Sequence, residues 1–99
     1  MIVNELVSIL VPVYNIEKSI EKNINILIEK VSPFLMNFEI IISDDGSSDN
    51  SKEEIKKICL NFQNKSKNLK NIIGIYAKKN QGKGHALKRA CEVSNGEYI

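Results

Sequence analysis

The sequence predicts an α/β fold with a Rossmann-like parallel sheet, helices on both faces and the order β-α-β-α-β-α-β. Nearly continuous apolar runs, typical of strands covered on both faces, alternate with segments whose apolar residues recur at helical spacing. Strands that alternate with helices are joined by right-handed crossovers and lie parallel. The 99 residues are 42% apolar and 26% charged, which is ordinary for a globular protein. We therefore treat residues 1–99 as one unit.

The first half of the chain predicts two strands and a helix. The run "LVSILVPV" (6–13) is the first strand, and Pro12 is expected to end it because proline cannot donate to a sheet ladder. A helix is expected from Ile20 to Val31, where apolar residues recur on one face, and Ser32-Pro33 closes it. The second buried strand is "FEIIIS" (38–43).

The second half continues the same alternation. A helix is expected to start at Ser51, which has the spacing of a capping box with Glu54 and precedes an apolar stripe that extends to Phe62. Strand 71–77 follows, and Gly74 weakens it. A third helix at 83–94 ends at Asn95-Gly96, and residues 98–99 begin a fourth strand. Because the chain stops as this strand begins, we expect a piece of a longer protein.

Charge and composition argue against several classes of protein. A net charge of +2 and the lack of a basic cluster interleaved with aromatic residues argue against nucleic-acid binding. The amino terminus lacks the basic region of a signal peptide, and no apolar run approaches the ~20 residues that cross a bilayer. Cys59 and Cys91 are interpreted as small buried apolar residues rather than a disulfide or a nucleophile. The simplest location is the cytoplasm.

Three polar segments follow the predicted strand ends: "PVYN" (12–15), "SDDGSSD" (43–49) and "AKKNQGKG" (77–84). Parallel strands bring their carboxyl ends to one edge of the sheet, which is where such folds bind ligands. We therefore expect the three segments to meet at one site.

Each segment has a ligand interpretation and a structural one. Tyr14 can stack on a base, Asp45 can accept a hydrogen bond from a ring N–H, and Lys83, between two glycines at a helix start, suits a diphosphate. Alone, Tyr14 is equally a half-buried loop residue, "DDGSSD" a turn before a helix, and "GKG" a flexible loop. Their convergence favours a ligand site.

Three familiar sites do not match these spacings. "QGKGHA" lacks the leading glycine and the Ser/Thr of a P-loop, and no glycine follows the first strand as a dinucleotide fingerprint requires. A phospho-acceptor receiver domain needs paired aspartates after the first strand and a further one after the third, and "VPVYN" and "YAKKN" supply neither.

Together, "VSILVPVYNIEKSI", "IIISDDGSSDNS" and "NQGKGHALKRACEVSNGEYI" resemble the amino-terminal half of a family 2 inverting glycosyltransferase. The resemblance covers nearly the whole chain and implies a truncated GT-A fold, with residues 1–99 as its nucleotide-sugar-binding part. "NQGKG" is similar to members that build polyprenyl-phosphate sugars, and Ala90 stands where many relatives have glycine.

The resemblance also implies roles for particular residues. Tyr14 would lie against the base with Pro12 beside it, and Asp45 would contact the base. Asp44 would support the loop or act on the nucleotide indirectly, through residues that touch it. Glu17 would lie near the ribose or base, and Lys83 near the diphosphate or base. The expected nucleotide-binding residues are Pro12, Tyr14, Asn15, Glu17, Ser43, Asp44, Asp45 and Lys83.

The resemblance implies transfer of a sugar, with inversion, from a UDP- or GDP-sugar to a polyprenyl phosphate or a growing glycan of the cell envelope. Mg²⁺ or Mn²⁺ would be bound by an acidic D-x-D motif expected beyond Ile99, as would the catalytic base. Residues 1–99 alone are then expected to be inactive, and the full-length protein could act at the cytoplasmic face of the membrane. The alternatives are a non-catalytic nucleotide-binding or interaction module and, more distantly, a sugar nucleotidyltransferase, which would need a glycine- and arginine-rich loop where "PVYN" stands.

Overall fold

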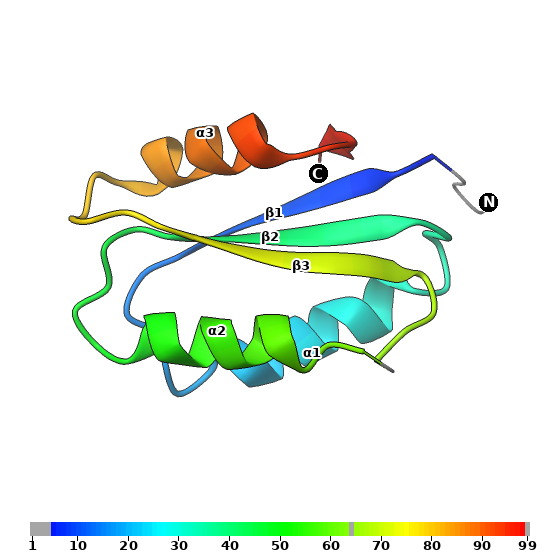
Figure 1. The fold of residues 1–99 in the computed structure, drawn as a ribbon, viewed down its shortest axis with the longest axis horizontal. Coiled ribbons are helices and arrows are strands. Elements are labelled where there is room, and N and C mark those ends of the chain that lie inside the picture. Colours follow the sequence, from blue (N-terminus) through cyan, green and yellow to red (C-terminus); the bar gives the residue numbers. More distant parts are fainter. Residues whose placement is uncertain (1–4, 64, 99) are drawn as a thin grey trace.

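The computed structural model describes residues 5–63 and 65–98, whose strands form a four-stranded sheet in the order β3-β2-β1-β4 (Figure 1). Every neighbouring pair is parallel, and α3 covers one face while α1 and α2 cover the other. The predicted fold class is confirmed. The elements are β1 (Val7–Val13), α1 (Ile20–Val31), β2 (Phe38–Asp44), α2 (Ser51–Leu60), β3 (Leu69–Tyr76), α3 (Lys83–Val93) and β4 (Glu97–Tyr98).

Most bounds differ from the predicted ones by one or two residues. Helix α1 has the expected bounds, β3 begins two residues earlier than predicted, and α2 ends at Leu60, so Phe62 follows it. Strand β4 begins at Glu97, and Ile99, which was expected to lie in it, falls outside the described residues.

Pro12 does not end β1, which continues to Val13. The N–H of Val7 donates to Asn37 O, and the carbonyl of Val13 accepts from Asp45 N. The main-chain N–H and C=O groups of these odd-numbered residues of β1 therefore face β2. Because the direction of these main-chain groups alternates along a strand, those of Pro12 face the opposite edge of β1. There β4 pairs only with Val7 and Ser8, so within the described chain the missing N–H breaks no ladder hydrogen bond.

The predicted capping box at α2 is wrong. Asn50 is the N-cap residue and makes no side-chain cap hydrogen bond, while Ser51 lies inside the helix. The hydroxyl of Ser51 instead donates to Asp49 Oδ1 at 2.6 Å, and the carboxylate of Glu54 pairs with Lys57 at 3.6 Å. Spacing alone did not show that a neighbouring aspartate competes for the serine hydroxyl.

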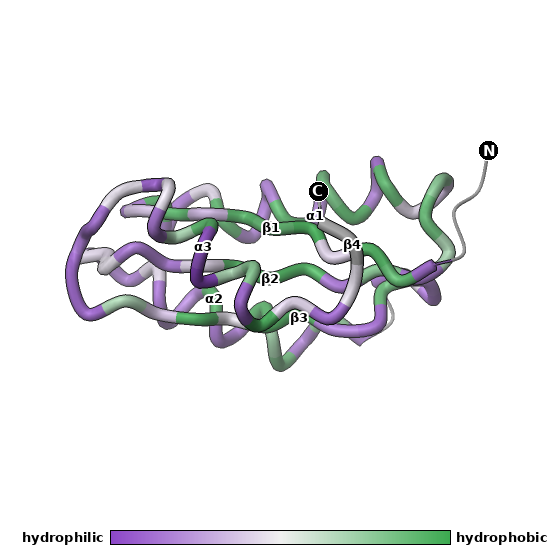
Figure 2. The backbone as a smooth tube through the Cα atoms, turned by 90° about the horizontal axis from the view of Figure 1, so that it is seen from above, coloured by the Kyte–Doolittle hydropathy of each residue, from purple (hydrophilic) through white to green (hydrophobic). Residues whose placement is uncertain are grey.

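The apolar core lies between the sheet and the helices α1 and α2. Alternate residues of β2 face it, and both helices turn isoleucines toward it, although Ile26 of α1 is exposed. Burial of these core side chains supplies most of the driving force for folding. Figure 2 shows hydrophobic residues along β1 and β2 and hydrophilic ones in the loops at the left end. The largest fully buried side chains of this core are Phe38, Ile20, Ile24, Ile40, Ile42 and Ile55.

The other face of β2 has carboxylates at both ends. Glu39 and Asp45, the residue that follows β2, lie on the same face as Ile41. Asp45 accepts from Gly82 N just before α3, and Glu39 accepts from Asn95 N just after it. Between them, the buried Ile41 lies on the face where Ala86 and Ala90 of α3 are fully buried. Small residues let α3 approach the sheet closely, and the two carboxylates fix its position along β2.

Glu39 is the centre of a buried hydrogen-bond network at the amino end of β2. Its Oε2 accepts from the Ser8 hydroxyl at 2.6 Å and from the Asn95 N–H at 2.8 Å, and the Ser8 hydroxyl accepts from Gly96 N at 3.0 Å. Burial alone would raise the pKa of Glu39, but hydrogen bonds from Ser8 and Asn95 outweigh it and hold this pKa below its ordinary value. The network anchors the turn from α3 into β4.

Candidate functional site

The three polar segments meet at the carboxyl edge of the sheet, at the left in Figure 1. They enclose a cavity of about 310 Å³ that is lined by Tyr14 from the first segment, Asp45 from the second and Lys83 from the third. The predicted convergence is therefore confirmed, whereas the role of these residues in nucleotide binding stays a prediction. The full lining is Pro12, Val13, Tyr14, Asp45, Asn80, Gly82, Lys83 and Ala86.

The lining combines exposed side chains with a buried carboxylate. Tyr14 is 45% exposed and Lys83 is exposed at the start of α3, so both are available to a ligand. The side chain of Asp45 is only 5% exposed. A ligand here would meet a ring, a cation and one largely desolvated acceptor, which is a suitable combination for a molecule with a planar part and an anionic part.

Four of the predicted residues do not line this cavity: Asn15, Glu17, Ser43 and Asp44. Ser43 is fully buried on the α3-facing side of β2, and its hydroxyl has no hydrogen-bond partner among the described residues. Glu17 is half-buried, and its main-chain N–H donates to Asp49 Oδ2 at 3.3 Å. A direct contact of these residues with a nucleotide stays a prediction.

Asp44 supports its own loop, as the sequence predicted. It is fully buried, and its Oδ2 accepts from the main-chain N–H of Ser47 at 2.9 Å while its Oδ1 accepts from the Ser47 hydroxyl. The adjacent aspartates thus point to opposite faces of β2 and bind different partners. This division explains how two neighbouring carboxylates are tolerated at one strand end.

Asn15 locks the loop after β1 to the loop after β2. It adopts a left-handed conformation with φ of 51°, which asparagine tolerates, and its Oδ1 accepts from Ser48 N at 2.8 Å. Three consecutive N–H groups, at residues 15, 16 and 17, donate to Ser47 Oγ, Ser51 Oγ and Asp49 Oδ2. The polar side chains after β2 therefore accept the hydrogen bonds of the main-chain N–H groups that follow Tyr14.

Asp49 is the acidic residue among these hydrogen bonds between the loops after β1 and β2. The Ser51 hydroxyl is the largest cause that holds the pKa of Asp49 below its ordinary value; burial works in the opposite direction, and the N–H groups of Ser51 and Glu17 add to the lowering. Asp49 therefore stays ionised at neutral pH and keeps the two loops together.

Asp45 binds the loop that follows β3. Its Oδ1 accepts from Gln81 N and from Arg89 Nη2, both at 3.0 Å, and its Oδ2 accepts from Gly82 N at 2.7 Å. The N–H of Gln81 is the largest cause that lowers the pKa of Asp45; burial opposes it, and Gly82 and Arg89 add to the lowering. Asp45 is thus an ionised, acceptor-only group held in a fixed orientation.

Arg89 and Asn80 are site residues that sequence reasoning missed. Arg89 binds Asp45 and also donates from Nη1 to Gln81 Oε1 at 3.0 Å, so it fastens the loop before α3 to the sheet. The sequence held one signal for Arg89: it lies two turns into α3 and three residues after Ala86, so both residues are on the same side of the helix. Asn80 also lines the cavity. Its segment, residues 77–84, was expected at the site, but Asn80 was not singled out within it.

Gly46 is required by the close approach of two loops, and Gly46→Ala is expected to lower the free energy of unfolding by at least about 2 kcal/mol. Its φ is +72°, and a Cβ there would lie 2.3 Å from Lys79 C and 2.6 Å from Asn80 N. Gly84→Ala in α3 is the matched control, because its Cβ would meet nothing within 4 Å and alanine favours helices. Urea denaturation measures both; equal stability of the two variants would contradict this explanation.

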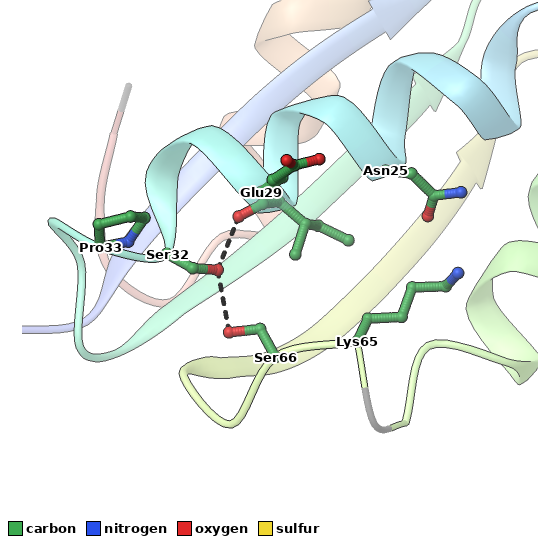
Figure 3. A pocket seen from close by; sticks show the side chains of 7 residues that line it. Asn25, Glu29, Ser32, Pro33, Lys65 and Ser66 are labelled. Carbon is green, nitrogen blue, oxygen red and sulfur yellow. Dashed lines mark hydrogen bonds between the residues drawn. The ribbon is translucent and has the colours of Figure 1, made fainter.

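A second cavity, of about 490 Å³, lies at the amino edge of the sheet (Figure 3). It is enclosed by the last turns of α1 and the loop before β3. The Ser32 hydroxyl donates to Ile28 O at 2.6 Å, and its oxygen lies 2.9 Å from Ser66 Oγ, whose hydroxyl it accepts from. These hydroxyl groups satisfy one another. Nothing in the sequence predicted a site here.

Among residues 5–63 and 65–96, whose side chains the structure describes, no three or more His, Cys, Asp or Glu side chains are grouped so that they could hold a metal ion. No helix in the described part of the chain is long and apolar enough to cross a membrane.

Comparisons with known proteins agree with the resemblance seen in the sequence. Residues 8–99 match the family model described as Glycosyl transferase family 2. An undecaprenyl-phosphate 4-deoxy-4-formamido-L-arabinose transferase of Aeromonas hydrophila is 28% identical over 96% of this chain, and glycosyltransferase GlyG of Streptococcus pneumoniae is 33% identical over 97%. Minor teichoic acid biosynthesis protein GgaA of Bacillus subtilis is 33% identical over 89%. The chain spans 27%, 29% and 18% of the lengths of these three relatives, respectively.

Proposed function

Because this chain belongs to glycosyl transferase family 2, we propose that it is the nucleotide-binding, amino-terminal part of an enzyme that transfers a sugar from a UDP- or GDP-sugar to an acceptor. The observation that carries the proposal is the cavity at the carboxyl edge of the sheet, where Tyr14, Asp45 and Lys83 come together from three separate segments. Residues 1–99 then form one part of a larger GT-A domain.

Each lining residue has a task in this proposal. Tyr14 stacks on the base, and Asp45 accepts a hydrogen bond from it. Gly82, the N-cap residue of α3, makes no side-chain cap, so the first N–H groups of the helix and the exposed Lys83 can bind the diphosphate. Base and diphosphate would thus lie across the cavity, with the base nearer to β2.

The described residues do not fit a divalent metal ion. Asp44 and Asp45 are the nearest paired carboxylates, but both carboxylates already accept hydrogen bonds from their own chain, and they point to opposite faces of β2. We therefore place the ligands of the expected Mg²⁺ or Mn²⁺ outside residues 1–99, together with the base that would deprotonate the acceptor for transfer with inversion.

The acceptor in this proposal is a polyprenyl phosphate or a growing glycan of the cell envelope, met at the cytoplasmic face of the membrane. Support comes from two relatives, whose names refer to undecaprenyl phosphate and to teichoic acid biosynthesis. The "NQGKG" segment at residues 80–84 agrees with the first of these.

Release of UDP or GDP from nucleotide sugars, measured with full-length protein, a divalent ion and a polyprenyl phosphate acceptor, tests this proposal. Tyr14→Ala is expected to raise the KM for the donor by about fivefold to a hundredfold, because a base loses a stacking partner worth about 1–3 kcal/mol. Phe34→Ala is the matched control, since Phe34 is an exposed aromatic residue, 59% accessible, outside the cavity. Nucleotide binding without turnover would favour a non-catalytic module, and no binding would refute the assignment.

A further inference from the structure

The hydrogen bonds of Asp45 leave it with little remaining capacity to accept. A carboxylate offers about four lone-pair positions, two on each oxygen. Gln81 N and Arg89 Nη2 use both positions on Oδ1, and Gly82 N uses one on Oδ2. One position on Oδ2 is left, on a side chain that lines the cavity and is otherwise buried.

We propose that this single acceptor makes the cavity selective for uridine over guanosine nucleotides, and that Arg89 sets the selectivity by occupying Oδ1. The inference rests on the proposed function, since it assigns the base of the nucleotide bound there. Uracil presents one N–H between two carbonyl oxygens, and it needs one acceptor. Guanine presents two adjacent donors, a ring N–H and an amino group, which require both oxygens of a carboxylate.

Guanine would therefore leave one donor unsatisfied beside a buried carboxylate. An unsatisfied buried donor is costly, and a site that is built to match hydrogen bonds rejects the mismatched ligand for this reason. A carbonyl oxygen of uracil could accept from the carboxamide of Asn80, an exposed residue that lines the cavity.

Arg89 is the residue on which this selectivity depends. Its guanidinium is held between Asp45 Oδ1 and Gln81 Oε1, so its orientation is fixed from both sides. Removing it would free one position on Oδ1 while the main-chain N–H of Gln81 still holds the loop. Guanine could then reach both carboxylate oxygens.

Calorimetric titration of the full-length protein with UDP and with GDP tests the proposal, because the two ligands share ribose and diphosphate and differ only in the base. UDP is expected to bind at least about tenfold more tightly, which corresponds to about 1.4 kcal/mol. Equal affinity for the two, or tighter binding of GDP, ADP or CDP, would overturn the selectivity and leave the proposed function intact. No binding of any of the four would overturn both.

The Arg89→Met variant tests the mechanism of selection. The ratio of the GDP and UDP dissociation constants is expected to fall by about tenfold, toward parity, because guanine gains the position on Oδ1 that Arg89 occupies. Lys88→Met removes the same charge from an exposed neighbour on α3 and is expected to leave the ratio unchanged. An unchanged ratio in a folded Arg89→Met variant would refute the role of Arg89. Should this variant not fold, the comparison of UDP with GDP on the unmodified protein still decides the selectivity.

Discussion

Asp45→Asn is expected to weaken nucleotide binding by about tenfold to a hundredfold in Kd, since a hydrogen bond to a charged group contributes about 1.5–3 kcal/mol. The carboxylate accepts hydrogen bonds from the loop before α3 and, in our proposal, from the base. An amide has one acceptor oxygen, and its NH₂ group would face N–H donors of Gln81 or Gly82. Calorimetric titration with UDP measures the effect.

Glu53→Gln provides the control for Asp45→Asn. Glu53 is an exposed carboxylate in the first turn of α2 and does not line the cavity, so the same change of charge there is expected to leave the UDP affinity unaltered. A folded Asp45→Asn variant with unchanged affinity would remove Asp45 from the site.

Glu39→Ala is expected to lower the free energy of unfolding by about 3 kcal/mol, because it leaves the buried hydroxyl of Ser8 without its acceptor and removes the charged acceptor of the Asn95 N–H. That is a large fraction of the 5–15 kcal/mol typical of domains. Urea denaturation of the full-length protein, or of residues 1–99 if they fold alone, measures it. Glu29→Ala, an exposed residue of α1, is expected to change stability by no more than about 0.5 kcal/mol.

The same carboxylate contributes a pH dependence of known sign. The pKa of Glu39 is lower in the folded state than the ordinary glutamate value of about 4.3, so the folded state binds fewer protons. Its stabilisation is therefore complete above about pH 4.3 and is lost as the pH falls through the lowered value. Glu39→Gln cannot titrate, and its stability is expected to fall less steeply with acid than that of the unmodified protein. Parallel slopes would show that Glu39 does not contribute in this way.

The fold and the location of the site could be predicted because they follow from local signals. Apolar runs and helical spacing gave the elements, and the parallel arrangement then required the segments at residues 12–15, 43–49 and 77–84 to meet. Tyr14, Asp45 and Lys83 were identified together for that reason. The rule that strands in such sheets end at a common edge needs no knowledge of side-chain contacts.

The partners of each polar group could not be predicted, because they depend on contacts between distant segments. Glu39 lies in an apolar run and reads as an ordinary strand residue, yet it binds Asn95, 56 positions away. The expected contact of Asn15 with nucleotide stays a prediction, but the bond from Ser48 N to its Oδ1, which holds the loop after β2, was not foreseen. Arg89 reaches Asp45 across 44 positions, a pairing that no spacing rule indicates.

An NMR titration of the ¹⁵N-labelled protein with UDP tests the nucleotide pocket most directly. The largest shift changes are expected on the amides of Tyr14, Asp45, Gly82 and Lys83, which line one cavity at the carboxyl edge of the sheet. The N–H groups of the cavity at the amino edge, around Ser32 and Ser66, are expected to stay unchanged and serve as an internal control. Shift changes confined to that second cavity, or none at saturating UDP, would contradict the account.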